Sequence, residues 1–93
     1  MERCLRIKGR VQGVGYRYWA VRRAKEIGGI SGYIHNEENG DVLAYISGES
    51  QNLDRLQALF YEGPFFSRVD SIESVPECIS FFPPLENGVF KRI

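Results

Sequence analysis

The sequence Gly9-Arg10-Val11-Gln12-Gly13-Val14-Gly15-Tyr16-Arg17 joins a segment of alternating apolar and polar residues to a segment with helical spacing. Its three glycines allow backbone N–H groups to converge on a ligand, and the helix N-terminus that follows adds a positive partial charge. An arginine at this end of a helix is disfavoured by the same dipole unless an anion lies between them. The sequence therefore predicts an anion-binding loop between a strand and a helix.

The residues on both sides of the loop have the periods that these two elements require. Leu5 and Ile7 alternate with charged residues, as expected for a strand with one buried face. From Tyr18 to Ile27 the apolar residues recur at helical spacing, and Gly28-Gly29 ends the predicted helix.

Downstream, Ile30–His35 and Val42–Ile46 predict two strands of an antiparallel hairpin, with an Asn-Gly pair in the connection. A second helix is indicated by a stripe of four apolar residues and two possible N-caps, and it ends at Gly63-Pro64. The stripe comprises Leu53, Leu56, Leu59 and Phe60, and the N-cap is either Ser50 or Asn52.

A further strand is expected over Ser67–Val75 and a short last one over Phe90–Ile93. The resulting order, β-α-β-β-α-β with a tail strand, predicts an α+β, ferredoxin-like sandwich in which two helices cover one face of an antiparallel sheet. We expect residues 1–93 to form a single domain, because a chain of this size has only a small core. The five residues Phe60, Phe65, Phe66, Phe81 and Phe82 are expected to fill that core or cover its end.

Composition limits the possible partners. Twelve basic and twelve acidic side chains cancel, so the chain lacks the broad positive field that would favour nucleic acid or an anionic membrane. No segment approaches the ~20 apolar residues of a membrane span. Cys4 and Cys78 fit neither a disulfide framework nor a paired metal-ligand spacing, which predicts reduced thiols and a soluble cytoplasmic protein.

Several kinds of phosphate chemistry are excluded by the loop itself. It lacks the lysine and hydroxyl residue of a nucleotide-hydrolysing P-loop, and Tyr18 stands where a dinucleotide-binding loop needs its third glycine. A cysteine phosphatase needs a thiolate six residues before its arginine, where this chain has Val11. Too few acidic and histidine ligands converge in the sequence to favour a metal site.

What remains is a site made of backbone amides and one guanidinium, with water as the nucleophile. These groups stabilise negative charge but supply no strong general acid, so they suit a substrate with a good leaving group. An acyl phosphate, which releases a carboxylate, meets that condition.

Two motifs in the chain have counterparts in a known family. One is the loop at residues 9–17, and the other joins Gly32-Tyr33-Ile34-His35-Asn36 to Asn39-Gly40-Asp41-Val42. They resemble the G-x-V-Q-G-V-x-F-R and G-W-V-x-N-x-x-D-G-x-V motifs of the acylphosphatase family, which are small ferredoxin-like enzymes. In this chain Tyr33 replaces the common tryptophan, and Glu37 follows Asn36 where some members carry a small hydroxyl residue.

The resemblance implies hydrolysis of acyl phosphates to a carboxylate and inorganic phosphate, with no metal, organic cofactor or phosphoenzyme. It implies that Arg17 binds the phosphate and that Asn36 orients the attacking water. It also implies that backbone amides of the loop surround the phosphate oxygens; these amides belong to Gln12, Gly13, Val14, Gly15 and Tyr16. We expect a monomer whose only partner is the small acyl phosphate substrate.

Two other functions were considered, of which the first stays open and the second is disfavoured. A noncatalytic module of the same fold would use the loop to bind phosphate or a phosphorylated metabolite, although such binding has no need of Asn36. RNA binding requires an aromatic pattern that the sequence lacks. Tyr16 is expected to pack with its hydroxyl at the surface rather than act as an acid, and we assign no chemistry to His35, the only histidine.

Overall fold

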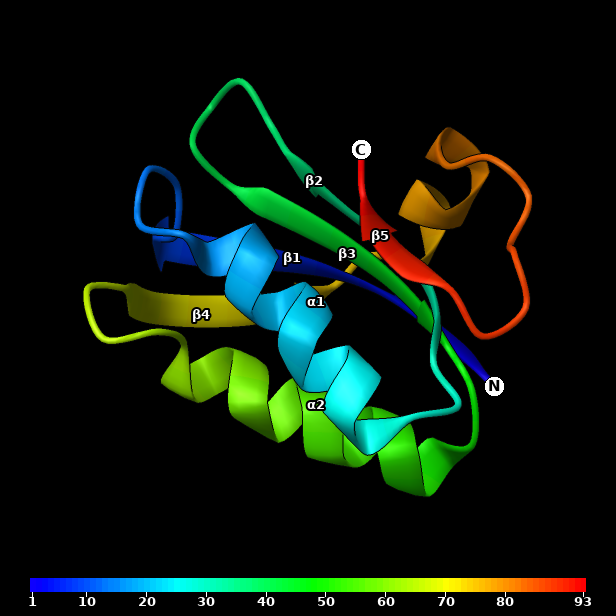
Figure 1. Cartoon of the computed structure of the whole chain (residues 1–93). Coiled ribbons are helices and arrows are strands. Elements are labelled where there is room, and N and C mark those ends of the chain that lie inside the picture. The colour runs from blue at the N-terminus through cyan, green and yellow to red at the C-terminus, as the bar shows by residue number, and fades with distance from the viewer.

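The computed structural model describes all 93 residues and contains five strands, two α-helices and one 3₁₀-helix (Figure 1). In chain order these are β1 (Glu2–Arg10), α1 (Tyr16–Ile27), β2 (Ser31–Asn36), β3 (Val42–Ser47), α2 (Ser50–Glu62), β4 (Arg68–Ser74), the 3₁₀-helix η1 (Pro76–Phe81) and β5 (Phe90–Arg92).

The strands form one sheet in the order β4-β1-β3-β2-β5. The first four are antiparallel to their neighbours, as the sequence predicted, whereas β5 runs parallel to β2. The sheet is therefore mixed, because the chain returns after η1 and enters beside β2 in the same direction. The split βαβ order of the first six elements makes this an α+β, ferredoxin-like fold.

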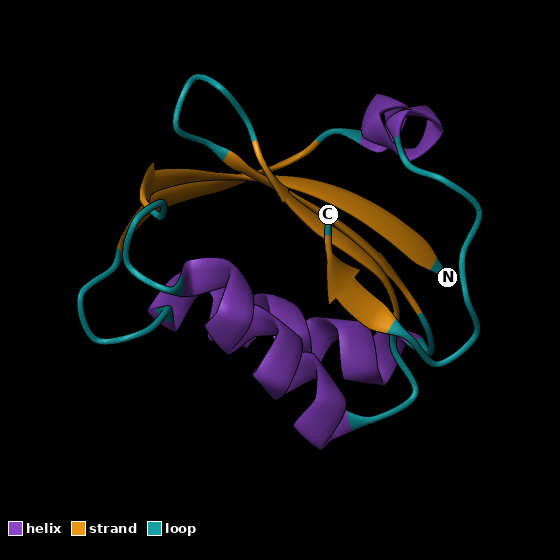
Figure 2. Ribbon diagram, turned by 45° about the horizontal axis from the view of Figure 1, so that its top comes forward, coloured by secondary structure: helices purple, strands orange, loops and turns teal.

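Both α-helices pack on the same face of the sheet (Figure 2). The main core lies between them and the strands, and it combines alternate residues of β1 and β3 with the apolar stripes of the helices. Its fully buried members include Ile7, Ile46, Leu53, Leu56 and Phe60. This arrangement confirms the two predicted helices and the face that they cover.

The helix ends differ in detail from the sequence prediction. α1 begins at Tyr16 rather than Tyr18, which brings Arg17 into its first turn. α2 is preceded by Glu49, and neither Ser50 nor Asn52 makes a side-chain capping bond. Local hydrogen bonds therefore contribute less to the start of α2 than its packed apolar stripe does.

A second layer lies on the opposite face of the sheet. There η1 crosses one end of the strands, as the small helix above the sheet in Figure 2 shows. A second buried cluster fills the space between them and contains Cys4, Tyr33, Leu43, Tyr45, Val75, Cys78 and Phe82. This layer was not predicted from the sequence, because the proline-rich segment after β4 has no regular period.

The prediction of reduced thiols is wrong, since Cys4 and Cys78 form a disulfide. Their Cα atoms lie 5.9 Å apart because η1 folds back over the start of β1. This proximity depends on tertiary structure and cannot be read from a sequence separation of 74 residues. Disulfides are rare in the reducing cytosol, so the cytoplasmic location stays a prediction.

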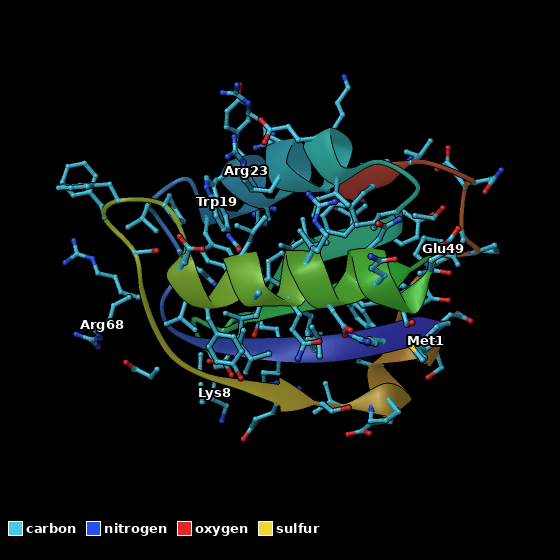
Figure 3. The ribbon with its side chains drawn as sticks, turned by 90° about the horizontal axis from the view of Figure 1, so that it is seen from below. Met1, Lys8, Trp19, Arg23, Glu49 and Arg68 are labelled. Atoms are coloured by element: carbon cyan, nitrogen blue, oxygen red, sulfur yellow. A yellow bond between two sulfur atoms is a disulfide. The ribbon has the colours of Figure 1, made fainter.

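The expectation for the phenylalanines is correct for only part of the set. Phe60 and Phe82 are buried, but Phe65, Phe66 and Phe81 are exposed, Phe65 by 92%. Phe65 and Phe66 lie in the turn between α2 and β4, which extends past the end of α2 (Figure 1 and Figure 3) instead of folding over the core. No helix of the structure has both the length and the apolar character needed to cross a bilayer.

Candidate active site

The loop between β1 and α1 depends on glycine at two positions. Gly13 and Gly15 have φ values of 72° and 77°, in the left-handed region that other residues rarely adopt. The amides of residues 12–15 donate no hydrogen bond to another backbone group. Glycine thus turns the chain so that these N–H groups are available to a ligand at the start of α1.

Gln12 fixes this loop to the hairpin that follows β2. Its Nε2 donates to the backbone oxygen of Glu37 at 2.7 Å and to that of Asp41 at 2.9 Å. One side-chain amide therefore spans both sides of the hairpin connection. Gln12 was predicted to surround the phosphate through its backbone amide. In the structure its side-chain amide also holds the loop in place.

Arg17 lies in the first turn of α1, where no acidic residue neutralises it. Its guanidinium makes one long hydrogen bond, in which Nη1 donates to the backbone oxygen of Ile93 at 3.4 Å. It forms no ion pair with an Asp or Glu side chain, since the salt bridges to these residues use other cations. Most of its donors are therefore free to bind an anion.

Asn36 is the last residue of β2 and pairs with Val42 across the hairpin. Its Oδ1 is buried and accepts no hydrogen bond from the protein. Buried polar atoms are nearly always satisfied, so an unpartnered one indicates a place for a water or a ligand. Asn36 also lines the same pocket as the loop.

One small pocket of about 190 Å³ brings most of the predicted site residues together. It is lined by Val11, Gln12, Gly13, Gly15, Tyr16, Arg17, Tyr18, Asn36 and Arg92. Val14 does not line it, since this side chain packs against the main core. The remaining predicted residues come from β2, the loop and the start of α1, which the fold places at one end of the sheet (Figure 1).

Three residues of the pocket were not predicted as site residues, namely Val11, Tyr18 and Arg92. Arg92 belongs to β5, and no site role was predicted for this tail strand because it carries no motif. Its guanidinium carbon lies 5.9 Å from the ring centre of Tyr18, within the range of a cation–π contact. The pocket thus has two guanidinium groups and no carboxylate, a local positive region in a chain without net charge.

Tyr16 contributes its backbone to the pocket and its side chain to the core. The hydroxyl does not reach the surface as expected but donates to the backbone oxygen of Phe60 at 2.7 Å. Burial raises the pKa of this phenol far above its usual value. Tyr16 is therefore unable to serve as a proton donor near neutral pH.

Glu37, directly after Asn36, turns its carboxylate away from the pocket. Its Oε1 accepts a hydrogen bond from Arg6 Nε at 3.0 Å on the other face of the sheet. This bond, the largest cause, raises the pKa of the Arg6 guanidinium. The negative charge next to Asn36 in sequence is thus paired elsewhere. No three His, Cys, Asp or Glu side chains are grouped so that they could hold a metal ion.

Comparison with known proteins gives the same family as the two sequence motifs. Residues 4–78 match the family model described as Acylphosphatase. The chain is 41% identical over 70 residues to the acylphosphatase of Nitrobacter winogradskyi, covering 75% of this chain and 70% of that protein. It is 37% identical over 78 residues to acylphosphatase 2 of Ralstonia nicotianae, covering 84% and 81%.

A solved structure agrees on the fold. The crystal structure of acylphosphatase from Bacillus subtilis has a TM-score of 0.82 to this chain, at 23% sequence identity. The likeness covers 99% of this chain and 97% of that one. The mixed sheet and its two helices are therefore shared over the full length of both proteins.

Proposed function

The chain belongs to the acylphosphatase family, and from this premise we propose that it hydrolyses acyl phosphates by direct attack of a water that Asn36 positions. The phosphoryl group is held by Arg17 and by the amides of the loop from Gln12 to Tyr16. The products are a carboxylate and inorganic phosphate. No metal ion, organic cofactor or phosphoenzyme takes part.

The observation that carries this proposal is the convergence of Arg17, the loop and Asn36 on one pocket. A phosphoryl group has three non-bridging oxygens that carry negative charge. Backbone N–H groups at a helix N-terminus and a guanidinium are suited to bind them, and they are already oriented before the reaction begins. As charge shifts during attack, these donors stabilise it without rearrangement.

Asn36 supplies the second requirement, which is a place for the nucleophile. We propose that the side-chain amide of Asn36, which lines the pocket, holds a water by a hydrogen bond. The water oxygen then presents a lone pair to phosphorus, on the side opposite the leaving carboxylate. An amide does not remove the proton as a strong base would, so its contribution is to orient the water, whose proton passes to a phosphoryl oxygen and leaves with the inorganic phosphate.

The absence of an acid in the pocket fits this substrate class. A carboxylate leaves without protonation near neutral pH, whereas an alkoxide from an ordinary phosphate ester does not. The pocket lining contains no His, Asp, Glu or Lys, and the buried Tyr16 phenol is bonded to Phe60. Arg92 adds a second positive charge that attracts the anionic substrate.

We propose that the protein acts as a monomer and as one domain, because Arg17, Asn36 and the loop, which the mechanism requires, line one pocket within a single chain. Gel filtration of the active protein tests this part of the proposal.

The test of the mechanism is hydrolysis of benzoyl phosphate in EDTA by the wild type, Arg17→Ala and Asn36→Ala. Loss of one preoriented contact is expected to cost about 3 kcal/mol of transition-state stabilisation, close to a hundredfold in rate. Arg55→Ala, on the exposed side of α2, is the matched control for an arginine removed from a helix. Arg17→Ala is expected to raise KM and lower kcat, and Asn36→Ala to lower mainly kcat.

Two outcomes contradict the mechanism: activity that survives both substitutions, and wild-type activity that disappears in EDTA. Saturable phosphate binding by calorimetry without any turnover supports the noncatalytic module instead.

A further inference from the structure

The backbone oxygen of Ile93 is shared by two donors from different parts of the fold. Arg17 Nη1 donates to it at 3.4 Å, and His35 Nδ1 lies 3.1 Å from it. The amide of Ile93 in turn donates to the oxygen of Ile34 at 3.0 Å. The shared oxygen therefore connects β2 to the guanidinium at the start of α1.

This arrangement determines which nitrogen of His35 carries a proton. A backbone oxygen only accepts hydrogen bonds, so Nδ1 must be the donor. The imidazole fulfils this requirement both in its neutral form with the proton on Nδ1 and in its charged form. The contact is thus a hydrogen bond in which His35 donates.

The outer layer of the fold holds the imidazole in place. The His35 ring packs against Phe81 of η1, with 5.3 Å between the ring centres. Phe81 is followed by the buried Phe82, and the same 3₁₀-helix is attached to β1 by the disulfide at Cys78. Contact with Phe81 on one side restricts the rotation of the His35 ring and so favours its hydrogen bond to Ile93.

We propose that His35 is a positioning residue for Arg17, acting through the backbone oxygen of Ile93. The inference rests on the proposed function, in which Arg17 binds the phosphoryl group. His35 keeps the oxygen beside Nη1, and the oxygen fixes one edge of the guanidinium plane. The donors on the other edges then point into the pocket, where a planar fork binds phosphate oxygens best.

The experiment compares His35→Leu with His35→Asn, two side chains of similar shape of which only Asn carries a donor near the position of Nδ1. The measurements are the affinity for inorganic phosphate by calorimetry, and KM and kcat for benzoyl phosphate. His35→Leu is expected to weaken phosphate binding and raise KM about fivefold, as expected for loss of one hydrogen bond, with a smaller change in kcat. His35→Asn is expected to restore most of the affinity.

Two controls separate positioning from general destabilisation. Lys91→Gln changes a neighbouring cation of β5 that pairs with Glu86 at 2.5 Å and does not line the pocket, and it is expected to leave phosphate affinity unchanged. In an Arg17→Ala background, His35→Leu is expected to cause no further loss of residual activity, because its effect passes through the missing guanidinium.

Equal losses with and without Arg17 would overturn the proposal, as would unchanged phosphate affinity in His35→Leu or failure of His35→Asn to restore it. If His35→Leu does not fold, Phe81→Ala tests the same proposal, because it removes the ring that packs against His35. It is also expected to weaken phosphate binding. Phosphate affinity is measurable without turnover. A wild type that binds phosphate but does not hydrolyse benzoyl phosphate therefore contradicts the proposed function while leaving the His35 comparison intact.

Discussion

Gln12 Nε2 lies 2.7 Å from the backbone oxygen of Glu37, and this contact joins the phosphate loop to the strand end that carries Asn36. The two halves of the proposed site thus keep a fixed separation. A phosphoryl group and its attacking water need a defined distance and line of approach, and small displacements cost much of the rate.

Gln12→Met removes this amide while keeping the length of the side chain. Activity is expected to fall about tenfold, mainly in kcat, since the water and the phosphoryl group lose their alignment. Stability is expected to change by less than about 1 kcal/mol, because both oxygens keep backbone donors. Benzoyl phosphate kinetics and urea unfolding check the two parts. A large loss of stability with unaltered kcat contradicts this view of Gln12.

Arg92→Ala tests the cation that sequence reasoning did not find. KM is expected to rise about fivefold with little change in kcat, because a second guanidinium attracts the substrate more than it stabilises the transition state. The effect is expected to shrink at high ionic strength, since the site is open to solvent. The neighbouring Lys91→Ala serves as control, and an equal rise in its KM would argue against a specific role for Arg92.

The disulfide between Cys4 and Cys78 is expected to stabilise the fold by about 4 kcal/mol through the entropy of the unfolded chain, given a separation of 74 residues. Reduction by dithiothreitol should lower the free energy of unfolding by that order, and the double variant Cys4→Ala, Cys78→Ala should lose a similar amount. The double variant itself should not respond to dithiothreitol. An unchanged unfolding midpoint after complete reduction of the wild type would contradict this contribution.

Stability is expected to decrease above pH 10. Burial, with a hydrogen bond to Glu2 as a lesser cause, raises the pKa of Tyr45 to about 12. Below pH 10 the phenol is protonated in both states, so its contribution is complete. As the pH rises from 10 to 12, the unfolded chain loses this proton first and unfolding becomes easier, by on the order of 2 kcal/mol.

Urea unfolding at several pH values measures this loss. Tyr45→Phe is expected to unfold with a shallower dependence on pH between 10 and 12 than the wild type. An identical slope in the two proteins would show that other groups cause the alkaline loss, among which Tyr16, whose pKa burial also raises, is the first to test.

The layer of helices on the sheet could be predicted because local periods encode it. Alternation along β1 and the stripe of α2 each mark one buried face, and glycines mark the ends of the helices. The outer layer could not be predicted in this way, since residues 76–85 acquire their positions from contacts with Tyr33 and Tyr45 in distant strands. The parallel pairing of β5 and the disulfide follow from that same return of the chain.

Part of the candidate site could likewise be predicted from the sequence, and part of it could not. Arg17 and Asn36 lie in motifs, and the structure places both at one pocket. Arg92, the side-chain contacts of Gln12 and the contact of His35 with Ile93 depend on which segments become neighbours. Sequence patterns carry no direct signal for such neighbours, and Glu37 shows the converse, because its position beside Asn36 in sequence does not bring its charge into the pocket.

The disulfide divides the chain into a covalent ring, residues 4–78, and the segment that follows it. Arg17 and Asn36 belong to the ring, whereas Arg92 and Ile93 belong to the later segment, which joins the sheet through three residues of β5. That segment is held to the rest of the fold by noncovalent contacts alone, among them the buried side chains of Phe82 and Phe90. Backbone amides of β5 are thus expected to exchange hydrogen faster than those of the strands inside the ring. The part of the pocket that β5 contributes is then open more often than the part formed by Arg17 and Asn36.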